Sequence, residues 1–120
     1  MGFTRYFNGN VTITPELVQD VQNIVANSGV AISGWDGTGE PQITLEEIRL
    51  NGTDDESCET FAIINGDNHN FCKTNREPYD IVVAAVLKRV SELNQNFNAD
   101  SDGGNEEEAV ANLYNTVFGK

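Results

Sequence analysis

Residues 79–93 constrain the fold most, because they can bury their apolar side chains only as a helix packed against another layer. Apolar residues recur there at helical spacing and form one wide face: Val82, Val83, Val86, Leu87, Val90 and Leu93. Pro78 is expected in the first turn, where its missing N–H costs nothing. A helix with so wide an apolar face is expected to lie across a β-sheet.

Two further helices are predicted from their start and stop signals. Thr14 is a suitable N-cap before Pro15, and Ser28-Gly29 is a suitable stop. The apolar face between them consists of Leu17, Val18, Val21, Ile24 and Val25. Near the end of the chain, Asn105 and Glu108 resemble a capping box. The closing helix that follows would bury Val110, Leu113, Tyr114 and Val117.

Short apolar or alternating runs outside these helices predict strands at residues 3–8, 30–35, 43–50 and 59–64, although residues 45–48 could instead form a helical turn. Turn residues predict a break at 8–10, an acidic loop at 51–57 and a loop within 94–104. Residues 65–70 are expected to form a hairpin-type connection, with Phe71-Cys72 beginning the return strand. We therefore predict a single α+β domain over residues 1–120, with about three helices on a mostly antiparallel sheet.

Charge narrows the classes of partner. The chain has 19 acidic residues, seven Lys and Arg, and a formal net charge of -12. Binding to DNA, RNA or anionic lipid needs a basic surface, so we expect neither nucleic acid nor membrane as a partner. The start of the chain lacks the apolar segment of a signal peptide, and no apolar run reaches membrane-spanning length. We therefore expect a cytoplasmic protein, in which Cys58 and Cys72 stay reduced.

The most suggestive cluster of polar residues precedes the helix at 79–93. Lys73 and Arg76 are two of the seven basic residues and fall within four positions. Backbone N–H groups at a helix start, a hydroxyl and two cations would together suit an anion, typically a phosphate. Lys73 would act as a point charge and Arg76 as a forked donor, and Thr74 and Asn75 would add hydrogen bonds.

Tyr79 or Trp35 could complete such a site by stacking on a base, although a place in the core is the favoured interpretation of Trp35. The alternative is that Lys73 and Arg76 pair with Asp80 and nearby acids and simply hold the loop in place. The sequence leaves both interpretations open.

Other chemistries have less support. Cys72 could be a nucleophile activated by Lys73, but His69 is the single histidine and has no evident orienting partner, so a buried, inert Cys72 is favoured. Residues 98–103 resemble half a calcium loop, yet Ala109 stands where the bidentate Glu is required. An acidic cluster at 54–59 could hold a catalytic metal, but such runs are usually solvated. We expect no cofactor and no metal.

The segments Phe71-Cys72-Lys73-Thr74, Arg76 and Pro78-Tyr79-Asp80 fit the pattern FCKT-x-R-x-PYD. This pattern resembles a widespread family of small phage and prophage proteins, as do the opening residues 1–6, Ser101-Asp102-Gly103 and Phe118-Gly119. Glu77 departs from the family, which more often has a basic residue there. The family has no known activity that could be assigned to this chain. The resemblance implies only that the chain is a small accessory protein of a phage.

By analogy with phage anti-defence proteins, we predict that this chain binds and sequesters a nucleotide-derived immune signal of the host. The predicted ligand-binding residues are Lys73, Thr74, Asn75, Arg76, Tyr79 and Trp35. A homo-oligomer is expected, because ligand-sequestering proteins often place their sites at subunit contacts. Two alternatives stay open, namely an enzyme that cleaves such a nucleotide and an acidic protein–protein inhibitor of a host defence factor.

Overall fold

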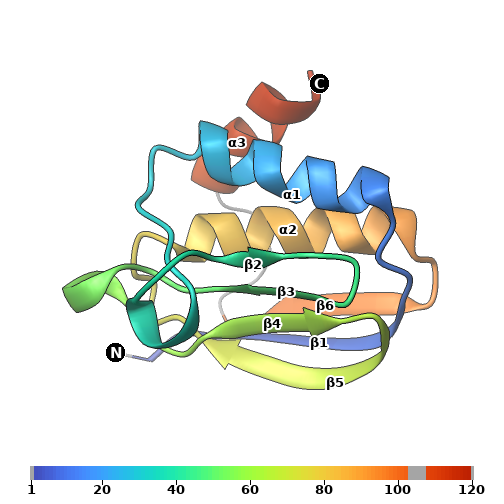
Figure 1. Cartoon of the computed structure of the whole chain (residues 1–120), viewed down its shortest axis with the longest axis horizontal. Helices are drawn as coiled ribbons and strands as arrows, with labels where there is room; N and C mark the ends of the chain where they lie inside the picture. Colours follow the sequence, from blue (N-terminus) through green and yellow to red (C-terminus); the bar gives the residue numbers. More distant parts are fainter. Residues whose placement is uncertain (1, 103–107, 120) are drawn as a thin grey trace.

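A computed structural model describes residues 2–102 and 108–119 of the chain. Within that part, three α-helices lie on one side of two small antiparallel sheets (Figure 1). The helices are α1 (Pro15–Asn27), α2 (Asp80–Leu93) and α3 (Glu108–Phe118). The predicted α+β class is therefore confirmed.

The two sheets contain three strands each. The first has the order β5-β1-β6, formed by Gly66–Lys73, Thr4–Val11 and Phe97–Ser101 respectively. The second has the order β2-β3-β4, formed by Gln42–Ile43, Glu47–Leu50 and Phe61–Ile64. Two short 3-10 turns, η1 (Trp35–Gly37) and η2 (Asp54–Glu56), lie in the connections around β2 and β3.

The hydrophobic core joins both sheets to the helices. The ring of Phe7 on β1 lies 5.4 Å from that of Phe61 on β4 and 6.2 Å from that of Phe97 on β6. Helix α2 packs on β1 and β6, and α1 and α3 pack on α2 (Figure 1). Alternation along β1 turns Arg5 and Phe7 toward this core and leaves Tyr6 and Asn8 on the opposite, exposed face.

The helix predictions hold closely where they can be compared. The Thr14 hydroxyl accepts the Leu17 N–H at 3.1 Å, which confirms the predicted cap of α1. Helix α2 begins at Asp80 with Tyr79 as its N-cap, so Pro78 precedes the helix instead of lying in its first turn. Asn105, the first residue of the predicted capping box, lies outside the described residues.

Several strand predictions are wrong. Residues 30–35 form no strand and contribute one isolated bridge, between Ser33 and Asn51, before η1 begins. Residues 45–48 form no helical turn, because the Thr44 and Glu47 backbones hydrogen-bond across a hairpin between β2 and β3. The acidic segment 51–57 does form a turn, η2.

The largest differences concern long-range pairing. The break predicted at 8–10 is absent, because β1 continues to Val11 and pairs with β5 along its whole length. Residues 66–70, predicted as a connection, are therefore strand, with Asn65 alone between β4 and β5. Part of the loop predicted within 94–104 is also strand, since β6 pairs with the other edge of β1.

Candidate functional site

Residues 71–80, the segment with the pattern FCKT-x-R-x-PYD, divide into a buried half and an exposed half. Strand β5 ends at Lys73, so alternation buries Cys72 and exposes Phe71 and Lys73. The side chains of Thr74, Tyr79 and Asp80 are also buried, whereas Asn75 and Arg76 are exposed. The two halves therefore have different physical roles.

The buried half is organised around Asp80. Its carboxylate accepts two hydrogen bonds from the Arg5 guanidinium, Nε to Oδ1 at 2.8 Å and Nη2 to Oδ2 at 2.7 Å. The Thr74 hydroxyl donates a third to Oδ1 at 2.6 Å. All three side chains are nearly inaccessible to solvent, so the charge of Asp80 is matched inside the protein. Asp80 thus pairs with Arg5, and the predicted pairing with Lys73 or Arg76 does not form.

Cys72 and Tyr79 complete the buried half. The Tyr79 hydroxyl donates to the Glu59 carbonyl oxygen at 2.6 Å, and the Cys72 thiol donates to the same oxygen at 3.4 Å. Burial raises the pKa of Cys72 to about 12 and also raises the pKa of Tyr79. At neutral pH Cys72 is a protonated thiol and no nucleophile. Tyr79 is fully buried and offers no face for a base, so its predicted stacking role is wrong.

The predicted anion cradle at the start of α2 does not form either. The N–H groups of Val82 and Val83 donate to the Tyr79 carbonyl oxygen, and that of Asp80 donates to Glu77. The carboxylate of Asp80 itself occupies the first turn, where negative charge complements the helix dipole. These three N–H groups are therefore bonded within the protein, and the Asp80 carboxylate already complements the helix dipole.

The exposed half forms a tight turn. The Thr74 and Asn75 N–H groups both donate to the Phe3 carbonyl oxygen, at 3.0 and 3.1 Å. Asn75 and Arg76 have φ angles of 54° and 58°, as the central residues of a type I′ turn do, and the Glu77 N–H closes the turn onto Thr74. The Arg76 guanidinium lies over the Phe3 ring, with its carbon 3.8 Å from the ring centre. Arg76 therefore stacks on Phe3 at the beginning of β1.

Trp35 is exposed next to the second sheet, so its favoured place in the core is wrong. It is 60% accessible, and the Arg49 guanidinium of β3 lies 5.3 Å from its ring centre. The adjacent Asp36 N–H donates to the Thr60 hydroxyl, just before β4. These contacts attach Trp35 to β3 and to the segment before β4, in which the Glu59 N–H donates to the Lys73 carbonyl oxygen at 3.1 Å.

The exposed face of the first sheet carries an aromatic pair that the sequence did not nominate. Tyr6 and Phe71 are direct register partners, 46% and 55% accessible, and their ring centres are 6.4 Å apart. They flank a shallow depression of about 290 Å³ whose other lining residues are Phe7, Asn8, His69 and Asn70. The alternation of residues 3–8 already separated Tyr6 from Phe7, but it could not say which side faces solvent.

Lys73 extends this surface. It follows Phe71 by two residues on the same face of β5, and it is exposed. Arg5, Arg49 and Arg89 form ion pairs, whereas Lys73 and Lys88 form none with the residues that the structure describes. On the side of Tyr6 away from β5, the Tyr6 hydroxyl donates a hydrogen bond to the Asp102 carboxylate. This hydrogen bond raises the pKa of Tyr6. We call Tyr6, Phe71 and Lys73 the aromatic–lysine face.

Comparisons with protein-family models, with curated proteins and with solved structures gave no match to this chain. No helix in the described ranges is long and apolar enough to cross a membrane. Within the same ranges, no group of three or more His, Cys, Asp or Glu side chains is arranged to hold a metal ion.

Proposed function

We propose that this protein captures a small anionic ligand with a planar ring, of the nucleotide-derived class, on the aromatic–lysine face. Acting as a phage-type accessory protein, it would sequester such a signal from a host defence system. The observation that carries the proposal is the exposed Tyr6–Phe71 pair next to Lys73, a cation with no ion pair among the described residues.

Each part of this surface matches one part of a nucleotide. Aromatic rings stack on bases of any kind, and such stacking contributes about 1–3 kcal/mol per base. The Lys73 ammonium would attract the phosphate, and the exposed Asn75 amide beside it can donate hydrogen bonds. Arg76 lies on the same turn and, stacked on Phe3, would support the phosphate end. In this proposal Tyr6 and Phe71 take the stacking role in place of the buried Tyr79, and the exposed Trp35 stays a predicted site residue.

Charge limits the size of the ligand. The net charge of -12 repels a long polyanion, and Asp102 lies beside Tyr6, so a ligand with few phosphates fits better than a nucleic acid. Capture without cleavage is the favoured outcome, because the Cys72 thiol is buried on the opposite side of β5 and stays protonated.

The test begins with thermal unfolding against cyclic oligonucleotides and ADP-ribose derivatives. A ligand at about a hundred times its dissociation constant adds about 2.7 kcal/mol of stability, which shifts the midpoint by several degrees. Calorimetry on a ligand so found should show an affinity loss of about tenfold or more for both Lys73→Gln and Phe71→Ala. Lys88→Gln is the matched control, since Lys88 also lacks an ion pair but belongs to α2, and it should bind normally.

Unchanged ligand affinity in both Lys73→Gln and Phe71→Ala would show that the aromatic–lysine face is not the binding site. Recovery of the ligand after denaturation separates capture from chemistry, because a binder returns it intact and an enzyme returns a product. If no member of the panel shifts the midpoint, the acidic protein–protein inhibitor becomes the better hypothesis, and a salt-sensitive pulldown of a host protein would support it.

A further inference from the structure

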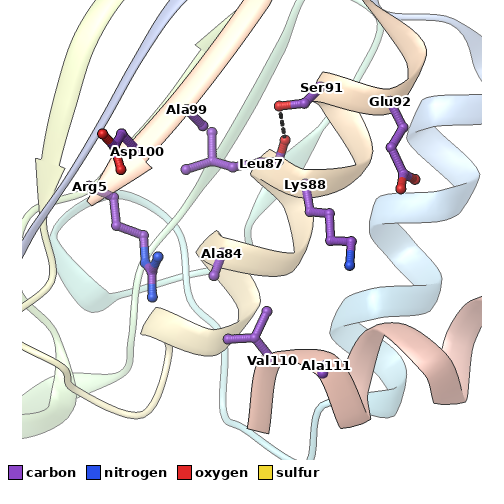
Figure 2. A pocket seen from close by; sticks show the side chains of 10 residues that line it. All are labelled: Arg5, Ala84, Leu87, Lys88, Ser91, Glu92, Ala99, Asp100, Val110 and Ala111. Carbon is purple, nitrogen blue, oxygen red and sulfur yellow. Dashed lines mark hydrogen bonds between the residues drawn. The ribbon is translucent and has the colours of Figure 1, made fainter. Parts of the chain in front are cut away.

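A second concavity lies on the helix side of the first sheet, away from the aromatic–lysine face. It measures about 350 Å³ and opens between α2, α3 and β6 (Figure 2). Its walls are largely apolar and come from Ala84, Leu87, Ala99, Val110 and Ala111. Arg5 lines it and Tyr6 does not, since neighbouring residues of β1 face opposite sides of the sheet. The pocket is therefore independent of the proposed function.

Most polar groups of the pocket have partners inside the protein. Arg5 is paired with Asp80, and the Ser91 hydroxyl donates to the Leu87 carbonyl oxygen at 2.9 Å (Figure 2). Asp100 accepts the Ser101 N–H at 2.8 Å. Arg5 and Ser91 therefore have little remaining capacity to hydrogen-bond a ligand.

Glu92 and Lys88 lie one helical turn apart on α2 and differ in their partners. The Glu92 carboxylate accepts the Tyr114 hydroxyl and lies 3.5 Å from Nη1 of Arg89. The Lys88 ammonium rests over the Tyr114 ring, 4.5 Å from its centre, and forms no ion pair with any described residue. Figure 2 shows Lys88 reaching from α2 toward the part of α3 that carries Ala111. Lys88 is thus the one cation of the lining without an opposite charge among the described residues.

We infer that this pocket binds a small amphiphile with a single anionic group, such as a medium-chain or aromatic carboxylate. The apolar walls would bury the body of the ligand, and Lys88 would neutralise its charge at the mouth. A volume of about 350 Å³ falls at the lower end of the range of about 300–1,000 Å³ for small-molecule sites, so the ligand is smaller than a dinucleotide. Glu92 also lines the pocket and disfavours a second negative charge.

The experiment titrates the purified protein by calorimetry with octanoate, 4-phenylbutyrate and naphthalene-1-sulfonate, and with octanamide as the uncharged match for octanoate. We expect at least one anion to bind, and octanamide to bind more weakly. Lys88→Gln should weaken that anion by about tenfold or more, because it removes the charge and keeps most of the stem. Ala111→Trp should abolish binding, because the exposed Ala111 position on α3 lets the ring fill the pocket without entering the core.

Lys73→Gln and Phe71→Ala are the matched controls and should bind the anion like the unmodified protein. Failure of all three anions to bind at millimolar concentration would overturn the inference. So would binding that survives both Lys88→Gln and Ala111→Trp, or binding lost equally in Lys73→Gln. Because the two sites use different lysines, either proposal can fail while the other stands.

Discussion

At the scale of single residues, Asp80 joins three parts of the chain. Its carboxylate binds Arg5 of β1 and the Thr74 hydroxyl after β5, and it lies in the first turn of α2. Removing a carboxylate from water is costly, and here three hydrogen bonds and the helix dipole offset that cost. Removing either Arg5 or Asp80 is therefore expected to destabilise the fold, because the other charge would stay buried without its partner.

We predict that Asp80→Asn lowers the free energy of unfolding by about 3–5 kcal/mol, because the Arg5 guanidinium is left buried without a counter-charge. Urea denaturation measures this loss. Asp55→Asn, at an exposed position of η2, is the matched control and should change stability by less than about 0.5 kcal/mol. Equal effects of the two substitutions would show that the Arg5–Asp80 pair does not hold the fold.

At the scale of elements, β1 is the central strand of the first sheet and must pair on both edges. It passes through Gly9, whose φ is +126°. A Cβ on Gly9 would collide with the backbone carbonyl oxygen of Asn96, in the turn that leads into β6. Gly9 thus lets β1 continue where its neighbours Asn8 and Asn10 predict a break.

Gly66, the first residue of β5, provides a matched comparison. Its φ of +125° is nearly that of Gly9, but a Cβ there would meet nothing within 4 Å. We predict that Gly66→Ala costs about 1–2 kcal/mol from backbone strain alone, and that Gly9→Ala costs at least about 2 kcal/mol more. Denaturant unfolding of both variants measures the difference. Equal losses would mean that the turn before β6 yields to a side chain.

Strand β6 shows why element prediction failed at this sheet. Of its five residues, Phe97 is buried and Asn98 and Asp100 are exposed polar residues that rarely favour strands. Pairing with β1 holds these residues as a strand, because it satisfies their backbone groups.

At the scale of the whole molecule, three ionisable hydroxyl and thiol groups are held neutral by the fold. Burial is the largest cause in each case, raising the pKa of Cys72 and of Tyr114 to about 12 and raising that of Tyr79 as well. In the unfolded chain these groups ionise near their ordinary values of 9.0 for Cys and 10.0 for Tyr. The unfolded state therefore releases protons at lower pH than the folded state does.

Alkaline pH should consequently destabilise the protein. The stability contributed by these neutral groups is fully present below pH 9.0 and is lost as pH rises toward about 12. Thermal unfolding followed by circular dichroism should show a midpoint that falls across this window. Tyr114→Phe keeps the ring and removes the hydroxyl, so it should make the fall shallower. A midpoint that stays constant from pH 9 to pH 12 would contradict the burial of these groups.

The candidate site was predictable from the sequence only in part. Lys73 and Asn75 are exposed as a ligand-binding role requires, because Lys73 is an outward residue of β5 and Asn75 lies in the turn that follows. Tyr79 and Phe71 both belong to the same short motif, and nothing local distinguishes the buried ring from the exposed one. Phe71 is exposed because it lies on the outer face of β5 beside Tyr6, whereas Tyr79 lies in the core with its hydroxyl bonded to the Glu59 carbonyl oxygen.

By itself the sequence determined the α+β class, the N-cap of α1 at Thr14 and the course of α2 to within a residue, because helical periodicity and capping act over a few neighbouring positions. The tertiary structure alone decided that β1 runs through Gly9, that β6 exists, and that Arg5 meets Asp80 across 75 positions of sequence. Strand pairing and burial of a charge both depend on partners far along the chain, so no local pattern encodes them.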